Sequence, residues 1–121
     1  MLLLGLPDND SEATQMKLEG EIIIPEAKLT QYLLVSRKED DKSQFLAQAG
    51  FTQTNPDQLR QAIILLIQTC DAVSDRQNKY GKYYRVEGPL IGPSSKLAVV
   101  TVWIERTTDG KIQFVTLKPR R

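Results

Sequence analysis

The sequence predicts an α+β domain in which an N-terminal strand and about three helices pack on a three- to four-stranded antiparallel sheet. Three strand-like stretches follow one another in the second half of the chain, at residues 82–90, 97–106 and 111–118. The connections between them are short and rich in turn residues, and Asp109-Gly110 is a strong hairpin signal. Because neither connection has room for a crossover helix, we expect the strands to form an antiparallel meander.

The elements upstream of the sheet are predicted from residue type and from the spacing of apolar residues. Residues 21–24 contain three consecutive β-branched isoleucines and predict a short strand that adds to the sheet. Pro25 suits the first turn of a helix, and Leu29 and Leu33 then lie on one face of it. A second helix is predicted over about residues 41–49.

A third helix and a loop complete the helical half. Gly50 stands where a left-handed residue would end the second helix. Asn55 is a predicted cap and Pro56 a predicted first-turn residue of the third helix, which extends to about Cys70. Additional apolar residues widen the core stripe of this helix, so we expect the helix to be well buried. Residues 71–81 are polar and predict a loop.

Length and composition limit the classes of protein to which the chain can belong. We expect residues 1–15 to be a flexible leader and residues 16–121 to be a single domain. No apolar stretch approaches the roughly 20 residues of a membrane helix, so we expect no membrane partner. The lone cysteine, Cys70, cannot form an internal disulfide, which favours a cytoplasmic location.

The sequence contains no histidine, which removes the commonest general base and the commonest transition-metal ligand. We therefore expect neither a metal nor a cofactor. Charge is unevenly distributed: residues 1–59 carry 5 Lys and Arg against 10 Asp and Glu, whereas residues 60–121 carry 11 against 5. This asymmetry suits either attraction within the fold, a basic surface for an anion, or two ordinary solvated surfaces.

Basic and aromatic residues alternate along the first strand of the meander. We expect Lys82, Tyr83 and Arg85, with Lys118 at the far end of the sheet, to be candidates for binding nucleic acid. Strand alternation places Tyr83 and Arg85 on one face and Tyr84 on the other. The alternative is that these are ordinary residues of an exposed sheet face.

Two carboxylates are the candidate acid and base, because Glu87 and Glu105 lie on strands that are predicted to be neighbours. Two carboxylates in contact could share a proton. The alternative is that both are surface partners of Lys or Arg. Trp103, in the central strand, is expected to pack in the core rather than to bind a ligand.

Several motifs occur in a familiar order. They are Met16-Lys-Leu, Lys28-Leu-Thr-Gln-Tyr-Leu-Leu, Ala49-Gly-Phe, Tyr84-Arg-Val-Glu-Gly-Pro-Leu and Thr101-Val-Trp-Ile. Over about residues 16–119 the chain resembles a small bacterial domain family of unknown function that is frequent in cyanobacteria. The resemblance implies an outline similar to barnase-like and RelE-like toxin domains.

Two functions follow from this interpretation. The first is a non-enzymatic protein-interaction module that could be part of a two-gene toxin–antitoxin-like system, with a partner from a neighbouring gene. The second is a toxin-like domain that binds or cleaves RNA, in which Lys82 and Arg85 hold phosphate, Tyr83 stacks and Glu87 or Glu105 is the base. The first needs fewer assumptions.

Overall fold

The computed structural model describes residues 17–34 and 42–120. The predicted leader and residue 41, the predicted start of the second helix, lie outside these residues. The α+β class and a set of about three helices are confirmed. The elements, in chain order, are β1 (Ile22–Ile23), α2 (Glu26–Lys28), η1 (Leu29–Leu33), α3 (Ser43–Ala47), α4 (Pro56–Thr69), β2 (Ala72–Asn78), β3 (Gly81–Ile91), β4 (Lys96–Arg106) and β5 (Ile112–Pro119).

The sheet has five strands in the order β1-β5-β4-β3-β2. The predicted meander is confirmed, because β3, β4 and β5 pair antiparallel in succession. The predicted strand count and the all-antiparallel arrangement are wrong: β1 pairs parallel with β5, and β2 adds a further strand beside β3. The chain between β1 and β5 contains all the other elements, so it is long enough for a parallel return.

β2 replaces the loop that was predicted over residues 71–81. Six of its seven residues are exposed, and its ladder with β3 shifts register between Ser74 and Arg76. An edge strand has neighbours on one side only and needs no apolar alternation. The polar sequence of this segment therefore gave a loop signal although its backbone forms a strand.

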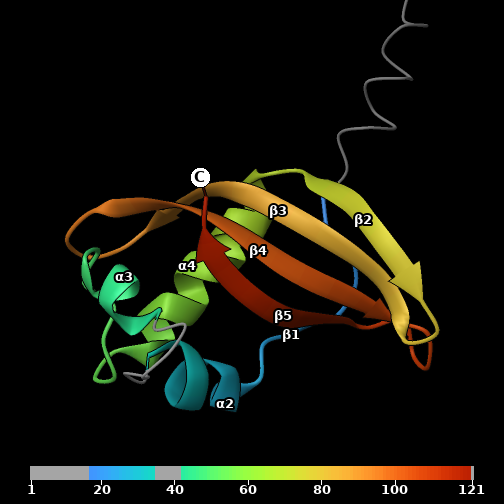
Figure 1. The fold of residues 1–121 in the computed structure, drawn as a ribbon, viewed down its shortest axis with the longest axis horizontal. Helices are drawn as coiled ribbons and strands as arrows, with labels where there is room; N and C mark the ends of the chain where they lie inside the picture. The colour runs from blue at the N-terminus through green and yellow to red at the C-terminus, as the bar shows by residue number, and fades with distance from the viewer. Residues whose placement is uncertain (1–16, 35–41, 121) are drawn as a thin grey trace, which may run out of the picture.

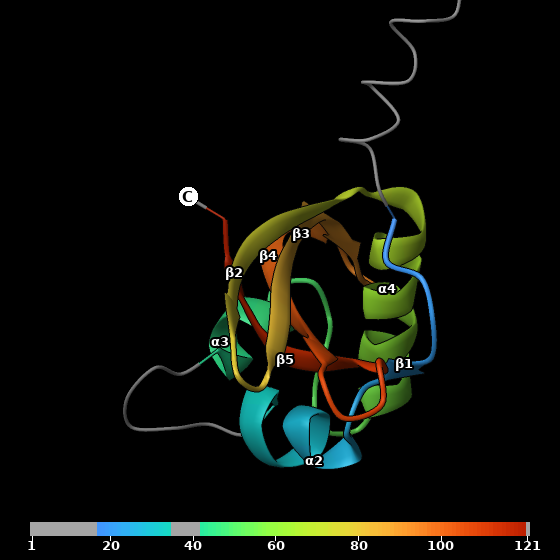
Figure 2. The same cartoon turned by 90° about the vertical axis from the view of Figure 1, so that its right-hand side faces the viewer.

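The core lies between α4 and one face of the curved sheet, and Figures 1 and 2 show α4 running along that face. Buried apolar residues of α4 (Leu59, Ile63 and Leu66) meet Val86 and Leu90 of β3 across this interface. The opposite face, here called the outer face, carries Tyr83, Arg85 and Glu87 of β3, as strand alternation predicts. α2 lies at the β5 side of the sheet in both views.

Trp103 is fully buried, which confirms its role in packing. Its ring meets Phe114 edge-on, with ring centroids 5.3 Å apart. The indole Nε1–H donates to Thr101 Oγ1 over 2.8 Å, and the Thr101 hydroxyl donates to the carbonyl of Val86 over 2.9 Å. This chain of bonds satisfies the buried donors, as a dry core requires.

The second helix, α3, has fewer residues than predicted. The left-handed glycine predicted just after it is present. Gly50 adopts a φ of +98°, and the amide of Phe51 donates to the Leu46 carbonyl over 3.2 Å. The predicted Asn55 cap is not formed. The Asn55 carboxamide instead accepts from the amide of Thr52 over 2.7 Å and so holds the loop before α4. Within the described residues, no helix is both long and apolar enough to cross a membrane.

Candidate functional site

The predicted nucleic-acid residues are divided between the two faces of the sheet. Tyr83 and Arg85 lie on the outer face, whereas Lys82 alternates with them and lies on the face of α4. Lys118 joins the outer face, because Val100 of β4 pairs with Glu87 on one side and with Lys118 on the other. The structure therefore brings Arg85 and Lys118 to one surface and separates both from Lys82.

Ion pairs connect the charged residues of the outer face. Arg85 Nη1 donates to Glu87 Oε2 over 3.0 Å, and Arg120 Nε lies 3.1 Å from Glu87 Oε1. The buried Nε of Arg85 makes no hydrogen bond, and Asp75 Oδ1 is 3.8 Å from it. The guanidinium of Arg76 stacks over the Tyr83 ring at 4.2 Å from the centroid. Glu87 is thus held between two guanidinium groups.

The two candidate acid–base residues do not form a pair. Glu87 faces Val100 in the register, whereas Glu105 faces Lys82 near the opposite end of the same ladder. Their positions also alternate onto opposite faces. A shared proton between these carboxylates would need contact that this register does not provide, although β3 and β4 are neighbours as predicted.

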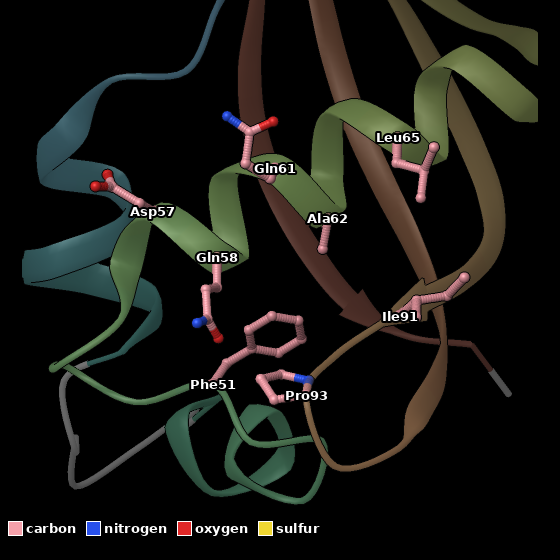
Figure 3. A pocket seen from close by; sticks show the side chains of 8 residues that line it. All are labelled: Phe51, Asp57, Gln58, Gln61, Ala62, Leu65, Ile91 and Pro93. Carbon is pink, nitrogen blue, oxygen red and sulfur yellow. The ribbon is translucent and has the colours of Figure 1, made fainter.

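A groove beside α4 is a concave surface whose lining is mainly apolar. It has a volume of about 480 Å³, and Figure 3 shows its lining side chains. α4 forms one wall, and the turn from β3 to β4 forms the other. Leu65 is 45% exposed and Ile91 is 55% exposed, although both are large apolar residues. The complete lining is Phe51, Asp57, Gln58, Gln61, Ala62, Leu65, Ile91 and Pro93.

The wall formed by the β3–β4 turn is fastened to the turn that follows α3. The amide of Ser94 donates to the Ala49 carbonyl over 2.9 Å, and the Ser95 hydroxyl donates to the Gln48 carbonyl over 3.0 Å. Gly92 permits this approach, because a Cβ at that position would lie 2.3 Å from the Ala49 carbonyl oxygen. This wall of the groove is therefore held in place, which lowers the entropic cost of binding.

The rim of the groove is polar and acidic at one end. Asp57 lies in the first turn of α4 and is exposed, and no described residue forms an ion pair with it. The Gln58 carboxamide accepts from Asn55 Nδ2 over 2.9 Å, so its position on the rim is fixed. An apolar floor with a polar rim is the usual anatomy of a protein-binding surface.

The turn between β4 and β5 holds an ion pair whose pKa values are shifted. In the described part of the chain, the resolved pKa shifts belong to Arg106 and Asp109 at the β4–β5 turn. The side-chain hydrogen bond from Arg106, followed by the Lys111 amide, lowers the pKa of Asp109 to about 2. The described residues do not contain three or more metal-ligating side chains in one group.

Sequence reasoning missed the groove as a site. Leu65 is one of the apolar residues that widen the core stripe of its helix, and this is the signal that could have indicated an exposed apolar face. Ile91 gave no such signal, because it directly precedes a turn and continues an alternating strand. The contribution of Phe51 and Pro93 depends on the contact between α3 and the β3–β4 turn, which is tertiary.

Comparison with known proteins identifies a family and no individual relative. No curated protein and no solved structure matches the chain. The family model described as a domain of unknown function, DUF6883, matches residues 16–121. The resemblance to a family of unknown function that the sequence motifs indicate is thereby confirmed. The chain belongs to the DUF6883 family of domains of unknown function.

Proposed function

We propose that the chain is a non-enzymatic protein-interaction module, and that the groove beside α4 binds an apolar segment of a partner protein. The observation that carries the proposal is the exposure of Leu65 and Ile91 on opposite walls of one groove. Removing such apolar surface from water favours association. Phe51 and Pro93 provide an apolar floor on which a partner side chain could anchor.

The dimensions and charge of the groove define the chemistry of its partner. The wall from Asp57 to Leu65 covers eight helical rises, or about 12 Å. This length suits about two turns of an amphipathic helix, which would place its apolar face in the groove. The carboxylate of Asp57 favours a basic residue at one end of that helix. We therefore propose a partner segment with apolar anchors and a lysine or arginine at one end.

The proposal includes a biological setting, which rests on the resemblance to a small bacterial family. In this setting the chain acts in the cytoplasm of a bacterium, as one member of a two-gene toxin–antitoxin-like system. Its partner is then the product of a neighbouring gene. Residues 1–15 form a flexible leader in this proposal, and residues 16–121 form the single binding domain.

The test is co-expression with the neighbouring gene product, followed by co-purification. Leu65→Glu and Ile91→Glu place a charge in the groove, and Val73→Glu is the matched control. Val73 is also a large, 51% exposed apolar residue, but it lies on β2. We expect the complex to form with the wild type and with Val73→Glu, and to be lost with both groove variants.

Circular dichroism would establish that the groove variants fold, as the exposure of both side chains leads us to expect. Two outcomes would contradict the proposal. One is a complex that survives both groove substitutions. The other is a self-associated wild type that Leu65→Glu converts to a monomer, because the occupant would then be a second copy of this chain.

A second candidate function is RNA binding on the outer face, with cleavage as its enzymatic form. It is favoured by the stack of Arg76 on Tyr83 beside Arg85 and Lys118. A flat aromatic ring and nearby guanidinium groups suit a base and its phosphates. If the domain cleaves RNA on the outer face, Glu87 would be the base. Glu105 could be the base only for RNA bound on the opposite face.

Fluorescence anisotropy with single-stranded RNA tests this candidate. Lys118→Gln and Lys82→Gln remove the same charge from opposite faces, so a site on the outer face is weakened by the first substitution and not by the second. The slope of log K against the logarithm of salt concentration should become shallower by about one in Lys118→Gln. Equal effects of the two substitutions, or the absence of saturable binding, would exclude a site on the outer face.

A further inference from the structure

A second pocket lies on the α4 side of the sheet, at the end remote from the β3–β4 turn. Its volume is about 290 Å³, near the lower end for small-ligand sites. Glu105 and Tyr84 reach it from β4 and β3, and Ile112 reaches it from β5. The segment before β1 closes the pocket with Lys17, Leu18 and Glu19.

Tyr84 supplies a polar group that has no partner. The residue is only 8% exposed, and its hydroxyl makes no hydrogen bond to any described residue. Among the described residues, the fully buried side-chain polar atom without a partner is Arg85 Nε and not the Tyr84 hydroxyl, so this hydroxyl stays within reach of a ligand. Since Tyr84 lines the pocket, a ligand there could accept a hydrogen bond from the hydroxyl or donate one to it.

The carboxylates of the pocket are also unpaired. Neither Glu19 nor Glu105 forms an ion pair with a described residue, although Glu105 is half-buried. Lys82 faces Glu105 in the register but makes no ion pair with it. Lys17, the cation that lines the pocket, is engaged by Asp71. A half-buried carboxylate without a partner favours a cationic ligand.

We propose that this pocket binds a small organic cation, namely an ammonium or guanidinium group on a short aliphatic chain. The cation would lie against Glu105 and Glu19, and one of its N–H groups would donate a hydrogen bond to the Tyr84 hydroxyl oxygen. Leu18 and the buried side chain of Ile112 would contact the aliphatic chain. The described residues contain no group of three or more metal-ligating side chains.

The test is an NMR titration of the full chain with n-butylguanidine, with n-butanol as the uncharged control. We expect saturable shifts at the amides of Tyr84, Glu105 and Ile112 with n-butylguanidine and none with n-butanol. Glu105→Gln should weaken binding about tenfold, because a charge-assisted pair becomes a neutral one. Tyr84→Phe, which keeps the ring, should weaken binding about threefold.

Glu87→Gln is the matched control, since it removes the same charge from the outer face and should leave the Kd unchanged. A capped Gly-Gly-Arg-Gly-Gly peptide distinguishes the source of the cation. Saturation of the same amides by the peptide assigns the pocket to a side chain of a partner, and saturation by n-butylguanidine alone assigns it to a free small molecule. Both results support the proposal.

Three results would overturn it: equal binding of n-butanol, an unchanged Kd in Glu105→Gln, or no saturation of the pocket amides. If Glu105→Gln fails to fold, Glu19→Gln provides the same comparison, because Glu19 is exposed. The pocket shares no lining residue with the groove beside α4. Failure here would therefore leave the proposed protein-binding function standing, and the reverse also holds.

Discussion

Replacing Gly92 by alanine should destabilise the fold, although the same substitution at an unhindered position would stabilise it. A Cβ at residue 92 would lie 2.3 Å from the Ala49 carbonyl oxygen and 2.9 Å from Phe51 Cε2. Restoring ordinary contact requires the β3–β4 turn to move away from α3 by about 1 Å. That movement breaks the bonds from Ser94 and Ser95 to the turn that follows α3, which are 2.9 and 3.0 Å long.

The expected size follows from these two bonds. Each contributes about 0.5–1.5 kcal/mol, so their loss costs about 1–3 kcal/mol. Alanine in place of glycine recovers about 0.4–1 kcal/mol by restricting the unfolded chain. With the middle of each range, we therefore expect Gly92→Ala to lower the free energy of unfolding by about 1.3 kcal/mol.

Urea unfolding followed by circular dichroism would measure this difference. Ser95→Ala is the control, because it removes one of the two bonds without a clash and should cost less. An unfolding free energy for Gly92→Ala equal to or above that of the wild type would refute the reasoning. It would mean that the turn is not held against α3 and that the groove does not have a fixed wall.

Two further predictions concern the core and the β4–β5 turn. Thr101→Val leaves the Trp103 indole without its acceptor and should cost about 1–3 kcal/mol in urea unfolding; an equal cost in a Trp103→Phe background would contradict this origin. An NMR titration should give Asp109 a pKa of about 2, and Arg106→Gln should return it towards its ordinary value of 3.8. Because folding lowers this pKa, the stability linked to Asp109 is present above pH 3.8 and is lost as the pH falls towards 2. A pKa near 3.8 for Asp109 in the wild type would contradict this prediction.

The elements with strong local signals could be predicted from the sequence. β3, β4 and β5 are marked by β-branched and aromatic residues and by turn residues, and α4 by its apolar stripe and Pro56. β2 could not be predicted, because an exposed edge strand has the composition of a loop. The parallel pairing of β1 is a contact between residues some ninety positions apart, and no local pattern encodes it.

The candidate site was predicted less completely than the fold. Alternation along β3 correctly separated Tyr83 and Arg85 from Tyr84, and the same alternation implied that Lys82 would lie apart from Arg85. The link from Glu87 to Arg120 depends on where the end of β5 lies, and the sequence does not encode it locally. The groove depends on the approach of α3 to the β3–β4 turn, which only the tertiary structure shows.

The most direct test of the proposed function is an NMR cross-saturation experiment on the complex between the deuterated chain and its protonated partner. Saturation passes to the methyl groups that the partner contacts. The proposal predicts transfer to Ala62, Leu65 and Ile91, which line the groove. Transfer instead to Val102 and Ile104, which face Arg85 and Tyr83 in the register, would place the partner on the outer face and contradict the proposal.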